Sequence, residues 1–557
     1  MFIHKILSVL VLILLLQVSP TMACTNFLVT KGASADGSTM ITYAADSHTL
    51  YGELYFWPAA DYPEGAMLDV YEWDTGKYLG KIPQIRHTYQ VTGNMNEHQL
   101  AIGETTFGGR KELASQPDAL IDYGSLIYIT LQRAKNAREA IQVMTSLVKD
   151  YGYYSSGESF SIADPNEVWV LEMIGKGEGH KGAVWVAMRI PDGYVSGHAN
   201  QARITQFPLN DPANCLYSSD VISFAVENGW YEGKNADFSF SDTYAPVDFS
   251  GARFCDARVW SGFNRINSQM GQYENYALGQ VTYGANGYAT NRMPLWVKPD
   301  APLTLANVKE MMRDHYEGTA LDMTKDLGAG PHQLPYRWRP MTWKVDSAEY
   351  VHERAISTQQ TGFSFVAQCR ANYPDPIGGI LWFGVDDTYS TCYMPVYCGV
   401  KEVPNSLKVG NGDMLTWSET SAFWTFNLVT NFCYLRYNDM ITDLRKVQLQ
   451  LEDGFYKSVA ETDRQAVELW KKGDTSAAYA LLTNYSVNQV ESTVKKWKEL
   501  GQYLIIKYKD GNVMREKDGQ FERNESGKLP ASPLHPAYPE SWYRTIIKGN
   551  EAHFKAQ

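Results

Sequence analysis

The chain has 557 residues, a length that fits one large domain with appendages or two to three ordinary domains. Hydrophobic residues make up 44% and charged residues 20% of the sequence, which is typical of a folded globular protein and excludes a largely disordered one. The formal net charge is −12 at pH 7 and no basic cluster reverses it, so no nucleic-acid partner is expected.

The first 23 residues have the pattern of an export signal. A basic start at Lys5 precedes the apolar run 6–16, which is well short of the roughly 20 residues that a membrane-spanning helix needs. Small and polar residues follow from Ser19, and cleavage is expected after Ala23. We therefore predict a signal peptide over 1–23 and an exported protein, periplasmic or secreted, without stable membrane insertion.

The mature chain is predicted to begin with a β-hairpin. Residues 24–30 favour a strand, the Asp-Gly pair at 36–37 is a hairpin-turn signal, and 39–44 can run back as the partner strand. A hairpin about this loop pairs residues whose numbers sum to roughly 70. This register returns Asp46 to the neighbourhood of Cys24.

Farther along the chain, strand and helix patterns come in blocks. Apolar spacing predicts a mostly helical segment over 115–151 and a loop-rich stretch over 230–300. Strands are predicted over 168–174, 184–190, 363–368, 379–385 and 391–396. Charged helices are expected from about 445, one of them opening at a capping box over 486–489. Segregated blocks favour an α+β fold over alternating βαβ units.

The seven cysteines are Cys24, Cys215, Cys255, Cys369, Cys392, Cys398 and Cys433. An exported compartment permits disulfides, but the sequence does not choose among the pairings open to the cysteines other than Cys24. The sequence has no CxxC, no HExxH and no close Cys/His pair, so no metal site is predicted.

A cysteine left at the N-terminus by cleavage carries its own base. Reference pKa values are about 8.5 for a thiol and about 7.7–8.0 for an α-amine, so the amine of Cys24 could accept its thiol proton near neutral pH. Such a nucleophile needs a charge partner for the amine. It also needs N–H or amide donors for the oxyanion that forms during acyl transfer.

Four sequence blocks carry a resemblance to a known family. They are CTNFLVTKGASADGSTMI (24–41), NMNEHQLAIGETT (94–106), VWVAMRIPDGYVSGHANQARI (184–204) and ILWFGVDDTYSTCYMPVYCGV (380–400). In this order they resemble the cysteine dipeptidase/secernin family of N-terminal nucleophile hydrolases, distant relatives of choloylglycine hydrolases and penicillin V acylases. The resemblance spans about 24–500. It implies a four-layer αββα sandwich, hydrolysis of dipeptides or short peptides, and neither metal nor cofactor.

The resemblance implies roles for residues that match the family by position. Cys24 would be the nucleophile and, through its amine, the base, while Asp46 would hold that amine. Asn200 matches an asparagine that donates to the oxyanion. Arg258 matches an arginine near the nucleophile, with Arg253 as a competing alignment.

Two further positions and one departure complete the predicted site. Thr106 falls near the second oxyanion position, and His198 is placed at the substrate edge, with packing as its alternative role. Where the family commonly has Arg-Asn-x-Asp, this chain has Tyr43-Ala-Ala-Asp46. Thiolate stabilisation or substrate contacts at this edge are therefore expected to differ from the family pattern.

These observations predict three segments: a signal peptide (1–23), a catalytic domain (24–444) and a C-terminal helical extension packed on it (445–557). Small peptides are the expected partners, and a homo-oligomer is compatible with the sequence. One alternative is an acylase of the bile-salt or penicillin V type, with a deep apolar pocket beside Cys24. The other is a glycan-binding surface lipoprotein with Cys24 lipidated, in line with 36 tyrosines and 15 tryptophans.

Overall fold

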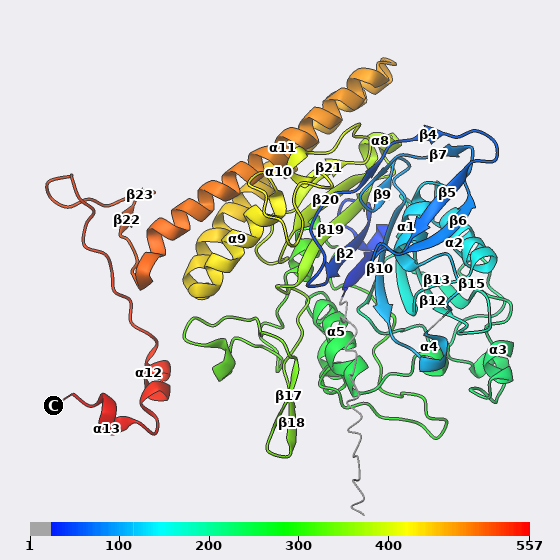
Figure 1. Ribbon diagram of the computed structural model, residues 1–557, viewed down its shortest axis with the longest axis horizontal. Helices are drawn as coiled ribbons and strands as arrows, with labels where there is room; N and C mark the ends of the chain where they lie inside the picture. Colours follow the sequence, from blue (N-terminus) through cyan, green and yellow to red (C-terminus); the bar gives the residue numbers. More distant parts are fainter. Residues whose placement is uncertain (1–23, 115, 557) are drawn as a thin grey trace, which may run out of the picture.

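The computed structural model describes residues 24–114 and 116–556, and the predicted signal peptide lies outside the described residues. Strands and helices are both well represented, and two large antiparallel sheets form the centre of the molecule (Figure 1). The predicted mixed α and β class is confirmed.

The first large sheet has seven strands and contains the N-terminal hairpin. Its order is β16 (Trp296–Val297), β14 (Val195–His198), β1 (Asn26–Val29), β2 (Thr39–Asp46), β19 (Thr361–Cys369), β20 (Ile380–Val385) and β21 (Met394–Tyr397). The second has eight strands. Its order is β15 (Cys215–Tyr217), β13 (Ala183–Arg189), β12 (Val168–Gly175), β11 (Gly157–Ala163), β10 (Ala101–Phe107), β9 (Met95–Asn96), β8 (Val91–Thr92) and β3 (Phe56–Trp57).

The hairpin forms in the predicted register. Leu28 lies opposite Ile41, so the paired numbers sum to 69, and an isolated bridge joins Thr25 to Ala44. A short 3-10 turn (Lys31–Ala33) lies in the connection. The register brings the C-terminal end of β2 next to the residue that precedes β1, as predicted.

Helices cover the outer faces of both sheets. The bounds are α1 (Tyr123–Leu131), α2 (Ala137–Tyr151), α9 (Ala422–Leu435), α10 (Tyr437–Lys471) and α11 (Thr475–Tyr508). The first two contact the eight-stranded sheet, the last three contact the seven-stranded sheet, and β1 and β2 contact β10 and β11 of the other sheet. Figure 1 shows α1 and α2 on one side of the sheets and α9–α11 on the other.

Smaller elements lie around this body. The two-stranded sheets are β4 (Ala60–Asp61) with β7 (His87–Thr88), β5 (Met67–Tyr71) with β6 (Tyr78–Pro83), β17 (Thr342–Val345) with β18 (Ala348–Val351), and β22 (Glu516–Lys517) with β23 (Gln520–Phe521). The shorter helices are α3 (Ser223–Glu227), α4 (Phe240–Tyr244), α5 (Ala257–Asn264), α6 (Glu274–Ala277), α7 (Leu305–Met312), α8 (Asp375–Gly378), α12 (Glu540–Ile547) and α13 (Glu551–Phe554). The segment after α11 extends away from the sheets (Figure 1).

All five downstream strand predictions are confirmed by β12, β13, β19, β20 and β21. The mostly helical segment predicted over 115–151 contains two helices, α1 and α2. Asn136 accepts a hydrogen bond from the Glu139 N–H and caps α2, which separates it from α1. The apolar spacing continues across the break because both helices face the same sheet.

The predicted capping box over 486–489 is wrong. Ser486 lies inside α11, which begins at Thr475 after the N-cap Asp474, and its buried hydroxyl accepts the N–H of Tyr397 in β21. The serine therefore satisfies a strand-end donor instead of starting a helix. Residue 445 similarly falls inside α10, so the change to charged sequence does not mark a helix boundary.

All seven cysteines are free thiols in the structure. Within residues 24–114 and 116–556, no helix combines the length and the apolar character needed to cross a bilayer.

The packing of the C-terminal helices gives a stability prediction. Trp497 in α11 is fully buried and stacks on Phe426 in α9, with ring centroids 4.6 Å apart. Trp497→Ala is expected to lower the free energy of unfolding by about 3–5 kcal/mol because it leaves a cavity at this contact. Ile505→Ala on the same helix, where the side chain is 44% exposed, is the control. Urea denaturation measures both, and equal losses would contradict the packing assignment.

Candidate active site

Cys24 lies at the N-terminal end of β1 and is completely buried. Its Sγ is 3.5 Å from Oε1 of Glu104 and 3.8 Å from the hydroxyl of Tyr43. The Tyr43 hydroxyl in turn donates to the same Glu104 oxygen at 2.6 Å. The thiol is therefore held between β2 of one sheet and β10 of the other.

The surroundings of Cys24 disfavour the thiolate. Burial is the main cause that raises the pKa of its thiol, and the carboxylates of Glu104 and Asp46 add to the rise. Hydrogen bonding of the Cys24 sulfur with the main chain of Asp46 and with the Tyr43 hydroxyl acts in the opposite direction but is weaker. The thiol stays protonated at neutral pH unless a further positive charge comes close to it.

Arg258 in α5 connects the parts of the site. Its Nη1 donates to the carbonyl oxygen of Cys24 at 2.7 Å and to Oγ1 of Thr25 at 2.8 Å. Its Nη2 donates to the carbonyl oxygen of Ala199 at 3.0 Å and to Oδ1 of Asn200 at 2.8 Å. The guanidinium group is fully buried, so it fixes Cys24 and Asn200 relative to each other.

Asn200 is held in a specific orientation. Its backbone φ is 64°, in the left-handed region that asparagine tolerates better than most residues. Its Nδ2 donates to the carbonyl oxygen of Thr106 at 2.6 Å. An amide nitrogen carries two hydrogens, so one N–H remains for an oxyanion.

The loop that carries Asn200 is anchored by a buried carboxylate. Glu172 in β12 accepts the main-chain N–H groups of Arg203 and Ile204, at 2.5 Å and 3.0 Å. Burial raises the pKa of Glu172 to about 7 despite these two hydrogen bonds. The carboxylate satisfies two donors just after Asn200 and limits movement of the loop.

Asp46 has one satisfied and one free carboxylate oxygen. Oδ1 accepts the hydroxyl of Thr361 at 2.6 Å, whereas Oδ2 is buried without a hydrogen-bond partner. Burial raises the pKa of Asp46 to about 7, although Thr361, Arg354 and Arg258 act against this rise. A buried carboxylate with a free oxygen can accept a hydrogen bond from an ammonium group placed beside it.

The structure brings Thr106 into the site and places His198 in a packing position. Thr106 contacts Asn200 through its carbonyl and donates its hydroxyl to Glu158 at 2.9 Å. His198 is buried, and its two ring nitrogens are bonded to Thr105 at 2.7 Å and Ser161 at 2.8 Å. Burial lowers the pKa of His198 to about 3, so the ring is neutral and both nitrogens are occupied. Its predicted substrate contact stays a prediction, and these contacts favour packing.

Arg253, the competing alignment, does not contact Cys24. It forms an ion pair with Glu353 and donates to the carbonyl oxygen of Leu278. The two arginines lie in one continuous helical stretch, where the π-helical turn Gly251–Asp256 runs into α5. Of the two arginines, Arg258 is therefore the one that contacts Cys24.

Four residues at the site were not predicted: Tyr43, Glu104, Glu158 and Arg354. Glu104 sits two residues before Thr106 on β10, so the two side chains lie on one face of the strand, and this alternation could have identified it. Glu158 is likewise a glutamate within a completely buried strand. Arg354 lies in a loop without any sequence signal, yet its Nη2 is buried and unpartnered, and burial and Arg258 lower its pKa to about 9.

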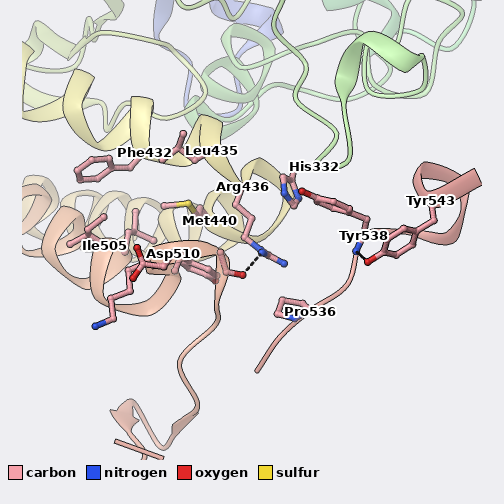
Figure 2. Close-up of a pocket in the computed structure, with 14 residues that line it drawn as sticks. His332, Phe432, Leu435, Arg436, Met440, Ile505, Asp510, Pro536, Tyr538 and Tyr543 are labelled. Atoms are coloured by element: carbon pink, nitrogen blue, oxygen red, sulfur yellow. Dashed lines mark hydrogen bonds between the residues drawn. The ribbon is translucent and has the colours of Figure 1, made fainter. Parts of the chain in front are cut away.

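The described residues hold no candidate metal cluster, and a separate cavity lies outside this site. No group of three or more His, Cys, Asp or Glu side chains within residues 24–114 and 116–556 could hold a metal ion. A cavity of about 480 Å³ lies between the ends of α9, α10 and α11 and the C-terminal segment (Figure 2). Its lining includes His332, Arg436 and Tyr538 but none of the residues around Cys24, so it is separate from this site.

Comparison with known proteins shows the family to which this chain is similar. The model of peptidase family C69 matches residues 23–55 and 50–450. A probable dipeptidase of Salmonella dublin is 25% identical over 407 residues, covering 70% of this chain and 83% of the relative. Probable dipeptidase B of Lactococcus lactis is 23% identical over 504 residues, covering 87% of this chain and 95% of the relative. A dipeptidase of Bifidobacterium longum is 23% identical over 497 residues, covering 80% of this chain and 84% of the relative.

The family match over most of the chain and the names of these relatives define a cysteine-type peptidase. The chain belongs to peptidase family C69. The predicted relationship to the cysteine dipeptidases is thereby confirmed.

The contacts of Arg258 give a prediction for activity. Arg258→Lys keeps the charge but loses the planar fork that reaches Cys24 and Asn200 together. We expect kcat/KM for peptide hydrolysis to fall at least about 30-fold, because charge-assisted hydrogen bonds of this kind contribute about 2 kcal/mol each. Arg253→Lys is the matched control, and the expectation fails if the two variants lose activity equally.

Proposed function

We propose that this protein is an exported dipeptidase in which Cys24, freed by cleavage after Ala23, is the nucleophile. The observation that carries the proposal is the placement of Cys24 at the start of β1, with the free oxygen of Asp46 on one side and the Arg258–Asn200 pair on the other. The family match and the printed names of the relatives support dipeptides as substrates.

The reaction follows from these positions. The α-amine of Cys24 takes the thiol proton, and the thiolate attacks the scissile carbonyl carbon. The free N–H of Asn200, together with a backbone N–H, stabilises the oxyanion. The resulting ammonium group returns the proton to the leaving amine, and a water molecule then hydrolyses the thioester.

Cleavage of the signal peptide would also activate the enzyme. The environment of Cys24 raises the pKa of its thiol, so the thiol needs a nearby cation. A new α-ammonium group beside Asp46 supplies one and gains a carboxylate partner. A chain that keeps a residue before Cys24 has an amide at this position, without a base.

The order of the layers supports the finer fold assignment. Helices on the eight-stranded sheet, the two facing sheets, and helices on the seven-stranded sheet follow one another in the order of an αββα sandwich. In such a fold the nucleophile at a strand end lies between the sheets, which agrees with the contacts of Cys24 to β2 and β10.

The first experiment tests the nucleophile. Intact mass and N-terminal sequencing of exported protein should give Cys24 as the first residue with a free amine. Cys24→Ala should abolish hydrolysis of a dipeptide panel and Cys24→Ser should reduce it severely, while Cys215→Ala, remote on β15, retains activity. A lipidated terminus, or full activity in Cys24→Ala, would falsify the mechanism. Lipidation would also support the lipoprotein alternative, and cleavage only of acyl amides would support the acylase.

The second experiment uses Asp46→Asn. The pKa of Asp46 is about 7 in the folded state and near 4 in the unfolded state. Between about pH 4 and about pH 7 the folded state therefore keeps a proton on Asp46 that the unfolded state has lost. Its contribution to stability therefore falls as pH rises from about 4 to about 7 and stays unfavourable above that range. In a chain in which Ala23 still precedes Cys24, Asp46→Asn should raise the melting temperature more at pH 8 than at pH 4.

In the chain that begins at Cys24, the same variant removes the partner of the α-ammonium group. We then expect Asp46→Asn to lower both the melting temperature at pH 8 and kcat. Differential scanning calorimetry and a dipeptide assay measure the two effects. The same response in both chains would contradict the pairing of Asp46 with the amine.

A further inference from the structure

Two glutamates beside the nucleophile form a carboxylate pair that the proposed mechanism does not use. Glu104 comes from β10 and Glu158 from the neighbouring strand β11, where Glu158 lies opposite Thr106. Both side chains are completely buried. They lie close enough to affect each other's titration, and burial is the main cause that raises the pKa of both carboxyl groups.

Each glutamate also has an oxygen that no donor among the described residues satisfies. These atoms are Oε2 of Glu104 and Oε2 of Glu158. No ion pair of the described chain includes either residue, although burial of a carboxylate is costly without a cation or donors. Asp74 adds negative charge nearby and raises the pKa of Glu158 further. The pair is therefore a buried carboxylate site that lacks a positive partner among the described residues.

The distance to Cys24 indicates what that partner is. Oε1 of Glu104 is 3.5 Å from the attacking Sγ. In a free dipeptide the ammonium nitrogen is two bonds from the scissile carbonyl carbon, about 2.5 Å away. A carbonyl carbon placed about 3–3.5 Å from Sγ for attack thus allows an orientation of the substrate in which the ammonium group reaches Glu104.

We propose that Glu104 and Glu158 form the subsite that binds the free α-ammonium group of the substrate. This deepens the proposed dipeptidase function and rests on it. The subsite restricts cleavage to the peptide bond after an unblocked N-terminal residue. A bound ammonium group also offsets the negative charge of Glu104 next to the thiol, so the substrate itself favours formation of the thiolate.

The test compares two substrates that differ only in the ammonium group, Ala-Ala and propanoyl-alanine. For the chain beginning at Cys24, kcat/KM should be at least about 30-fold higher for Ala-Ala, because a buried charge pair is lost without the ammonium group. Glu104→Gln and Glu158→Gln should each reduce this ratio at least about 10-fold, mainly by slowing hydrolysis of Ala-Ala and raising its KM.

A buried glutamate elsewhere in the chain provides the matched control. Glu452 in α10 is buried and paired with Arg313, so Glu452→Gln should leave the substrate ratio unchanged whatever it does to stability. Circular dichroism checks that the variants fold. The ratio of kcat/KM for the two substrates can also be measured on the wild-type chain alone, so the proposal stays testable if a variant does not fold.

The outcomes separate the two proposals. Equal wild-type rates on both substrates overturn the ammonium subsite, as does an equal loss on both substrates in Glu104→Gln, which would assign Glu104 to the amine of Cys24. Absence of dipeptide hydrolysis by the wild-type chain instead overturns the proposed function. Retention of the full ratio in both variants places the recognition of the ammonium group elsewhere.

Discussion

The site depends on one buried guanidinium group. Arg258 makes hydrogen bonds to main-chain or side-chain oxygens of Cys24, Thr25, Ala199 and Asn200, and so joins the start of β1 to the loop after β14. A buried cation without solvent is stable only when its donors are satisfied. The oxygens that satisfy it belong to the residues whose relative position the chemistry needs, so stability of the arginine and geometry of the site are the same constraint.

The carboxylates around Cys24 differ from Arg258, because their hydrogen-bonding capacity is not fully satisfied. Asp46, Glu104 and Glu158 are fully buried, and each keeps one oxygen without a partner. Such groups reduce the stability of the fold, and they are retained where function requires an unsatisfied charge. Two ammonium groups, one from the processed N-terminus and one from the substrate, would complete them. On these two proposals, the space between the two sheets would serve as a receptor for amines.

The sequence predicted the parts of the fold that depend on local patterns. The register of the hairpin, and with it the approach of Asp46 to Cys24, followed from the Asp-Gly turn, and alternation located β12 and β13. Tertiary contacts decided the rest. Ser486 matched a capping box but serves Tyr397, which is distant in sequence. The pair Glu104–Glu158 requires the pairing of β10 with β11, and Arg354 approaches Asp46 from a loop that no local pattern identifies.

The fixed position of Cys24 has a consequence for how the protein is made. Arg258 holds the Cys24 carbonyl and the Thr25–Ala44 bridge holds the next residue, so the chain cannot slide along β2 to compensate for an inaccurate cut. One additional residue would move the terminal amine by the full length of a residue, about 3.8 Å, away from the thiol that needs it. Under the proposed mechanism, in which Cys24 supplies its own base, the fraction of active molecules would depend on the fidelity of the processing peptidase, and specific activity would measure that fidelity.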